Sequence, residues 1–165
     1  MAEREVVLYP HPILKQRCEE VTDAEALRRV ARDLVDTMRV LPRCVGLAAP
    51  QIGELARVVA FDVTGHPKAT SCSGLVVIAN PVLVRADGDE LGREGCSSIP
   101  EFTGNVRRAT AIVVEGTTPE GDCVAIEADG FEARVAQHEL DHLEGILFLD
   151  RVVSRRDLFR RRSYG

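Results

Sequence analysis

Long apolar runs are absent from this sequence of 165 residues. No stretch approaches the roughly 20 apolar residues that a helix needs to cross a bilayer. The first ten residues, MAEREVVLYP, contain neither the apolar core of a secretion signal nor the Arg- and Ser-rich character of a transit peptide. We therefore expect no membrane association and a cytoplasmic location.

The cysteine pattern of a disulfide-bonded protein or a zinc knuckle is also absent. The five cysteines are odd in number and widely spaced, and no C-x-x-C sequence occurs. Without a secretion signal, a disulfide framework is not expected. Most of the five are expected to be small buried apolar side chains, with one available as a metal ligand.

A net positive charge is lacking as well. The formal net charge is −5, which argues against DNA or another nucleic acid as a partner of the whole molecule. The arginines are nevertheless uneven, because the last fifteen positions contain Arg151, Arg155, Arg156, Arg160, Arg161 and Arg162. We name residues 155–165 the basic tail.

The length and composition predict one domain over residues 1–165, with a core of ordinary size. Thr22 and Glu25 form a capping-box pattern, and apolar residues then recur at helical spacing as far as Pro42, which predicts an amphipathic helix near the N-terminus. Alternating and apolar segments punctuated by Gly and Pro predict strands over residues 57–63, 75–79, 82–85, 111–116 and 124–128.

The last third of the chain predicts a second helix over residues 131–143, with Gly145 as its C-cap. Residues 146–149 read as a strand, and the chain from Ser154 onward reads as a short tail helix. Without βαβ alternation, the fold class is α+β, with mixed or antiparallel β-sheets packed around the central helix 131–143.

The central helix contains the sequence H-E-x-x-H, formed by His138, Glu139 and His142. Residues four apart share one face of a helix, so the two imidazoles can bind one metal ion. A Glu beside the first His stands next to the open metal position, where it can take a proton from water. The alternative for such histidines is a hydrogen-bonded pair in the core.

The third ligand is not found downstream. One large class of zinc proteases has a third His in the pattern H-E-x-x-H-x-x-G-x-x-H, but that position is Phe148 here. Another class uses a downstream Glu, and no Glu follows Glu144. We therefore expect the third ligand upstream, where a thiolate would suit a borderline divalent metal.

Three segments, in this order, resemble the signature motifs of peptide deformylases, approximately GxGxAAxQ, EGCxS and QHExDH. They are GLAAPQIG at residues 46–53, EGCSSIP at 94–100 and QHELDHL at 137–143. The resemblance spans nearly the whole chain, from YPHP near the start to FLDRV before the basic tail. It implies a hydrolase that removes the formyl group from formyl-methionine and releases formate.

The resemblance implies a role for each matching residue. The ligands of one divalent metal would be Cys96, His138 and His142, with Fe²⁺ the usual ion of the family and Zn²⁺ or Ni²⁺ able to replace it. Glu139 would act as the general acid/base. The side-chain amide of Gln51 and the backbone N–H of Ser97 would stabilise the oxyanion. The implied substrate-binding residues are Val45, Gly46, Leu47, Gly95, Phe131 and Val135.

The implied partner is a formyl-Met nascent chain, and the basic tail would then dock on ribosomal RNA. Two alternatives remain open. One is another metal-dependent amidase or peptidase built on the same site. The other is a catalytically weakened relative that only binds formyl-Met peptides.

The sequence departs from the family pattern at two site positions. Cys44 replaces the first Gly of GxGxAAxQ, and we expect it in extended backbone facing the site wall. Ser97 replaces a Leu common after the ligand cysteine, which leaves the backbone N–H in place. Asp141 is expected to point away from the metal as a structural residue, and Arg107 and Arg108 are expected to be surface arginines.

Overall fold

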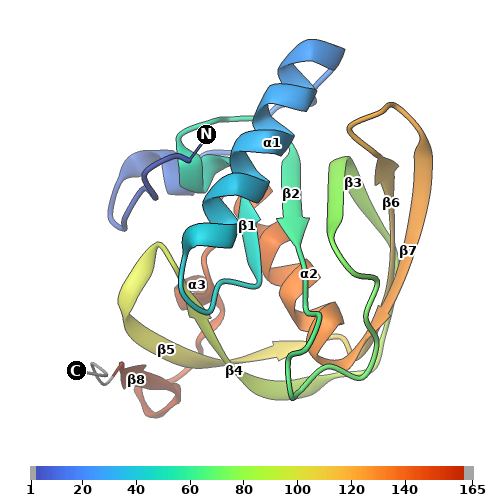
Figure 1. Cartoon of the computed structure of the whole chain (residues 1–165). Helices are drawn as coiled ribbons and strands as arrows, with labels where there is room; N and C mark the ends of the chain where they lie inside the picture. Colours follow the sequence, from blue (N-terminus) through green and yellow to red (C-terminus); the bar gives the residue numbers. More distant parts are fainter. Residues whose placement is uncertain (1–2, 162–165) are drawn as a thin grey trace.

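The computed structural model describes residues 3–161, and its strands form two antiparallel sheets (Figure 1). The larger sheet has the strand order β1-β2-β3-β6-β7. Its strands are β1 (Gly46–Ala48), β2 (Val58–Phe61), β3 (Val76–Asp87), β6 (Ala111–Thr117) and β7 (Cys123–Asp129). The smaller sheet has the order β4-β5-β8, with β4 (Glu90–Cys96), β5 (Ile99–Arg108) and β8 (Leu158–Arg160). The predicted α+β class is confirmed.

Helix α2 (Gly130–Leu143) lies between the two sheets, as the sequence predicted for the helix of the H-E-x-x-H motif (Figure 1). Its Ala133 and Ala136 are buried in one cluster with Phe61 and Ile78 of the larger sheet. Each fully buried large apolar side chain of this kind contributes roughly 1.5–3 kcal/mol. The helix that carries the candidate ligands is therefore held rigidly on its apolar side.

Helix α1 (Ala24–Val40) covers β1 and β2 and is the predicted amphipathic helix. Its apolar face packs into a second cluster that includes Leu34 and Val58. The predicted capping box was wrong, because the N-cap is Asp23, whose side chain accepts the Glu25 N–H at 3.1 Å. Thr22 lies one residue outside the helix.

Two predicted strands, 75–79 and 82–85, are one strand, β3. The break that the sequence suggested between these two segments is a β-bulge. The register of β3 with β6 shifts between Ala79 and Val82, and Asn80 has a φ of 50°. The hairpin predicted over 111–116 and 124–128 is confirmed as β6 and β7. The strands β1, β4, β5 and β8 were not predicted.

The C-terminal predictions were wrong. Residues 146–149 are not a strand, because the helical turn α3 (Phe148–Arg151) begins there, with the Asp150 carboxylate accepting the Leu147 N–H at 2.8 Å. The tail helix is absent from the described residues. The segment forms a 3₁₀ turn, η3 (Arg155–Asp157), and then β8, which takes its hydrogen bonds from β5. The rest of the basic tail, residues 162–165, lies outside the described residues.

Other short 3₁₀ turns are η1 (Pro12–Lys15) and η2 (Ala49–Ile52), the second of which carries Gln51. None of the helices within residues 3–161 is both long enough and apolar enough to span a membrane.

Candidate metal centre

Helix α2 and the end of β4 bring together the three predicted ligands. His138 and His142 lie one turn apart on α2, with ring centroids 5.1 Å apart, and both are buried. Cys96 is the last residue of β4, just before the two-residue turn to Ile99 of β5. The ligand atoms of Cys96, His138 and His142 all lie within 4.8 Å of one another.

The donor atoms of this cluster fit a divalent transition metal. The Nδ1 atom of His138 is engaged by Glu94, which leaves Nε2 for a metal, and Nε2 of His142 lies 3.4 Å from Cys96 Sγ. Two imidazoles and one thiolate with an open fourth position form a donor set suited to catalytic zinc or iron. The buried cluster therefore has the residues and the geometry to hold one divalent metal ion.

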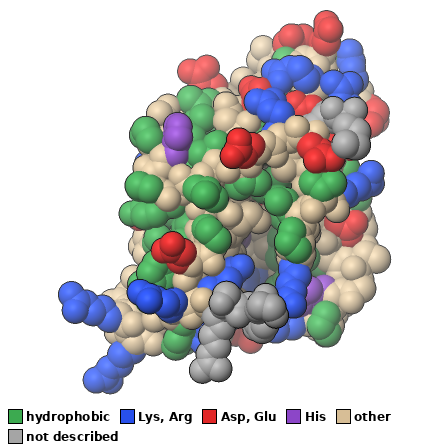
Figure 2. All heavy atoms as spheres, turned by 60° about the vertical axis from the view of Figure 1, so that its left-hand side comes forward, with side chains coloured by type: hydrophobic (Ala, Val, Ile, Leu, Met, Phe, Trp, Pro, Cys, Tyr) green, Lys and Arg blue, Asp and Glu red, His purple; other side chains and the backbone are tan. Residues whose placement is uncertain are grey.

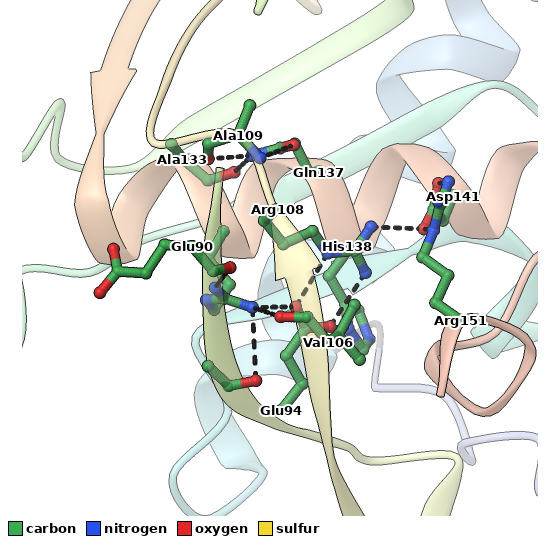
Figure 3. A network of polar contacts seen from close by, with 12 residues as sticks. Glu90, Glu94, Val106, Arg108, Ala109, Ala133, Gln137, His138, Asp141 and Arg151 are labelled. Atoms are coloured by element: carbon green, nitrogen blue, oxygen red, sulfur yellow. Dashed lines mark hydrogen bonds and ion pairs between the residues drawn. The ribbon is translucent and has the colours of Figure 1, made fainter. Parts of the chain in front are cut away.

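Glu94 orients the first histidine. Its Oε1 atom lies 2.9 Å from His138 Nδ1, and its two oxygens accept hydrogen bonds from Arg108 at 2.8 and 2.9 Å (Figure 3). Burial opposes ionisation of this carboxyl group, but the hydrogen bonds from Arg108 and His138 outweigh burial and hold its pKa well below the ordinary value. A carboxylate of this kind fixes the tautomer and the ring orientation of a ligating histidine.

Arg134 is a second support of Glu94. Its guanidinium donates to Glu94 Oε2 at 2.9 Å and to the carbonyls of Val106 and Glu90, both at 2.8 Å. The side chain can reach these acceptors because Gly92 leaves room for it: a Cβ on Gly92 would lie 2.7 Å from Arg134 Cζ. Helix α2 is thereby bonded to β4 and β5 beside the metal centre.

Arg108 continues the network to Asp141. It donates to Asp141 Oδ2 at 2.6 Å, and Arg151 donates to Asp141 Oδ1 at 2.8 Å (Figure 3). The structural role expected for Asp141 is confirmed. The surface location expected for Arg108 was wrong, because this side chain is buried against two carboxylates, whereas Arg107 is exposed and pairs with Asp89.

The motif glutamine Gln137 also has a structural role. Its amide exchanges hydrogen bonds with both backbone groups of Ala109, at 2.9 and 3.1 Å. These bonds join α2 to the segment between β5 and β6, as Figure 3 shows. No role was assigned to Glu94, Arg134 or Gln137 from sequence. The one available signal was that Glu94 and Gln137 stand inside the recognised motifs.

The carboxylate of Glu139 lies beside the ligands and against the backbone of β1. Burial raises the pKa of Glu139 to about 7, although the charge of His138 opposes the shift. Its Oε2 atom is buried with no hydrogen-bond partner among residues 3–161. A Cβ on Gly46 would lie 2.6 Å from Glu139 Oε1, so the glycine provides the space for this carboxylate.

Gln51 reaches the same cluster from η2. Its Nε2 atom donates to Ser98 Oγ at 3.1 Å and lies 3.4 Å from Cys96 Sγ, while its Oε1 accepts the Ala48 N–H at 3.0 Å. The side chain is buried, with 1% of its surface exposed. These contacts fix the direction of its NH₂ group toward the metal ligands.

Cys44 and Ser97, the two residues that depart from the family pattern, lie in contact with each other. Ser97 Oγ lies 3.7 Å from Cys44 Sγ, which in turn lies 3.2 Å from the carbonyl oxygen of Gly46. Burial, reinforced by the nearby Glu139, raises the pKa of the Cys44 thiol to about 11. The residue with positive φ here is Arg43, at 57°, so Cys44 imposes no left-handed strain on the chain.

The predicted substrate-binding residues fall into two groups. Val45, Phe131 and Val135 pack in the cluster between α2 and the larger sheet, and Phe131 stacks on His66 with ring centroids 4.1 Å apart. Leu47 is fully buried in the other cluster, under α1, so its side chain faces away from that group. Gly95 is exposed, next to Cys96.

Comparisons with known proteins agree with this site. The model of the polypeptide deformylase family matches residues 3–157. The peptide deformylase of Desulforudis audaxviator is 44% identical over 156 residues, which cover 93% of this chain and 96% of the relative. The peptide deformylase of Thermomicrobium roseum is 41% identical over 160 residues, covering 96% of this chain and 90% of the relative.

Solved structures give the same result. The crystal structure of peptide deformylase from Thermotoga maritima has a TM-score of 0.82 at 34% identity and covers 92% of this chain and 99% of that one. The crystal structure of peptide deformylase from Thermus thermophilus has a TM-score of 0.82 at 38% identity and covers 91% of this chain and 86% of that one. The chain belongs to the polypeptide deformylase family.

Proposed function

We propose that the cluster around Cys96 hydrolyses the formyl amide of formyl-methionine at the start of newly made polypeptides and releases formate. The family consists of metal-dependent hydrolases that remove this group. The observation that supports the proposal most strongly is the convergence of Glu139 and Gln51 on the three ligand atoms. We propose one catalytic domain over residues 1–165, working in the cytoplasm.

The proposed metal ligands are Cys96, His138 and His142, and the proposed ion is Fe²⁺, which Zn²⁺ or Ni²⁺ could replace. A bound divalent ion would supply Lewis-acid chemistry and lower the pKa of its water from about 15.7 toward about 7. Glu94 would keep the His138 ring in the orientation that ligation requires.

Glu139 is proposed as the general acid/base. It would accept a proton from the attacking water and later give that proton to the departing methionine amine. A raised pKa suits both tasks near neutral pH, since the group must exist in both protonation states during one turnover. Its partner-free Oε2 atom provides the required acceptor.

Gln51 and the backbone N–H of Ser97 are proposed to donate hydrogen bonds to the formyl oxygen as negative charge develops on it. The bonds that Gln51 makes to Ala48 and Ser98 hold its amide in place before the substrate arrives. Donors fixed in advance need no reorganisation during the reaction, which makes them effective in a buried site.

The methionine side chain is proposed to enter the apolar region of Val45, Phe131 and Val135, while Gly46, Leu47 and Gly95 offer backbone groups to an extended peptide. Stacking on His66 fixes the ring of Phe131 at this region. The segment that carries His66 is itself held to α2, because the buried Glu132 carboxylate accepts the Ser73 N–H at 2.6 Å.

Formate release from formyl-Met-Ala-Ser tests the function. Protein purified without oxygen and loaded with Fe²⁺ is expected to release formate, and a Glu139→Ala variant with the same metal content is the control. Peptide-bond cleavage without formate would support another amidase or peptidase. Binding of the peptide without either product would support the weakened relative.

The basic tail is proposed to dock on ribosomal RNA. Arg155 and Arg156 are exposed on η3 and are suited to phosphate contacts. Deleting the tail would remove β8 from its sheet, so charge reversal is the cleaner test. The double variant Arg155→Glu, Arg156→Glu is expected to co-sediment less with ribosomes at low salt and to keep its turnover of small peptides. Unchanged co-sedimentation would contradict the proposal.

A further inference from the structure

Arg161 follows β8 and reaches across the smaller sheet. Its N–H donates to the carbonyl of Glu101 at 2.7 Å, which continues the pairing of β8 with β5. Its guanidinium lies over Gly95 of β4, so closely that a Cβ on Gly95 would overlap Arg161 Nη2. A C-terminal side chain is thereby placed one residue from the metal ligand Cys96.

This guanidinium has no acceptor among residues 3–161, neither a hydrogen bond nor an ion pair. Arg93 on the same face of β4 is different. It stacks on the Phe159 ring at 3.6 Å and donates to Asn105 Oδ1 at 3.1 Å. Of these two arginines on the outer face of β4, Arg161 is therefore the one whose five guanidinium N–H donors are available to another molecule.

The free edge of β4 defines where that molecule would lie. β4 is the edge strand of the order β4-β5-β8, and an extended peptide can add to such an edge as a further strand. Residues opposite each other in neighbouring strands project their side chains on the same face. A peptide residue opposite Gly95 would thus direct its side chain toward the side on which Arg161 lies.

The surrounding charge favours an acidic side chain. Lys and Arg side chains gather in the lower part of the face in Figure 2, the end of the molecule at which β8 lies in Figure 1. Glu101, whose backbone carbonyl accepts the Arg161 N–H, is the acidic residue of β5, and its carboxylate forms no ion pair with Arg161.

We propose that Arg161 is a specificity-determining residue that selects formyl-Met peptides with Asp or Glu at the second or third position, whichever residue pairs with Gly95. The inference rests on the proposed function. It assigns to Arg161, the residue that follows β8, a role in recognising the peptide, and this role is separate from the docking role proposed for Arg155 and Arg156 of the same basic tail.

Four peptides test this inference: formyl-Met-Glu-Ser, formyl-Met-Ala-Glu and their Lys counterparts. At low salt, the wild type is expected to show kcat/KM about three- to fivefold higher for the acidic member at one of the two positions, as for an exposed ion pair. The preference is expected to arise from a lower KM for the acidic peptide. About 0.5 M NaCl should screen the charges and bring the ratio of the two kcat/KM values close to one.

Arg161→Met is expected to abolish this preference and Arg161→Glu to reverse it. The matched control is Arg160→Met, because Arg160 ends β8 just before Arg161 and successive residues of an extended chain face opposite sides. The inference would be refuted by equal kcat/KM values for the acidic and basic peptides, or by a preference that persists in Arg161→Met. In both cases formate release would still support the proposed function. No formate from any peptide would refute both.

Discussion

The carboxylate of Glu139 occupies the space that a side chain at residue 46 would fill. An added Cβ on Gly46 would lie 2.6 Å from Glu139 Oε1 and 3.0 Å from its Cδ. The glycine of the motif GLAAPQIG and the glutamate of the motif QHELDHL are thus matched in shape, although they are 93 positions apart in the chain. The fit places the carboxylate proposed as general acid/base against β1, beside the proposed metal ligands.

Substituting this glycine is therefore expected to displace the Glu139 carboxylate and so to impair the catalysis proposed for it. In Gly46→Ala the side chain of Glu139 must move, and a displacement of about 1 Å in a catalytic group can cost about 100-fold in rate. We expect kcat to fall by about that factor while the bound metal, measured by atomic absorption, is retained.

The matched experiment places the same change in a background with a shorter acid. In Glu139→Asp the clash with the new methyl group is relieved, so Gly46→Ala should cost much less there than in the wild type. An equal loss in the two backgrounds would show that Gly46 acts through something other than Glu139.

Substitutions at Gln51 and Ser97 test whether the oxyanion is stabilised by one side-chain donor and one backbone donor. Gln51→Leu removes a side-chain donor, and we expect kcat to fall by 10²- to 10³-fold, or roughly 2.7–4 kcal/mol. Ser97→Ala keeps the backbone N–H, and we expect less than about a threefold change. A large loss in Ser97→Ala would show that the hydroxyl, and with it the contact to Cys44, is required.

Arg134 is expected to control metal retention. Arg134→Met removes hydrogen bonds to Glu94 and to three strand carbonyls, which loosens the orientation of His138. Loss of such an outer support typically weakens metal binding by about 10- to 100-fold. Competition with a chromogenic chelator measures this directly, without any assay of activity.

Gly92→Ala provides an independent test, since the new methyl group would displace the same guanidinium. It should weaken metal binding in the same direction. Arg93→Met is the control, because Arg93 lies on the exposed face of β4. If this variant loses metal as readily as Arg134→Met, the role assigned to Arg134 is wrong.

The thiols should differ in their reactivity. Burial raises the pKa of Cys18 and of Cys44 to about 11, from the ordinary 9.0. A raised thiol pKa favours the protonated form, so about 100-fold less thiolate is present at pH 8, and the thiolate appears only as the pH rises toward 11. Cys72 and Cys123 are exposed.

We therefore expect iodoacetamide at pH 8 to label Cys72 and Cys123 well before Cys18 and Cys44, as read by mass spectrometry. In guanidinium chloride all five cysteines should react at similar rates. Rapid labelling of Cys44 in the folded protein would contradict the burial of this thiol in the site wall.

Local patterns explain which parts of the site could be predicted from sequence. His138 and His142 are four residues apart, so their common face follows from helix geometry alone. Cys96 and Gln51 were assigned through their motifs, and the structure brings both to the histidines.

The remaining features depend on strand pairing between distant segments. Arg108 looked like a surface residue because its partners, Glu94 and Asp141, are 14 and 33 positions away. The tail from Ser154 was predicted as a helix from its local composition, but the unpaired edge of β5 gives it a strand partner. Neither relationship has a short-range signal.

Formate release is the most direct measurement of the central claim. Iron-loaded wild-type protein is expected to release one formate per formyl-Met-Ala-Ser consumed, and Glu139→Ala with equal bound iron is expected to lose nearly all of this activity. Wild-type turnover no faster than that of Glu139→Ala would contradict the account.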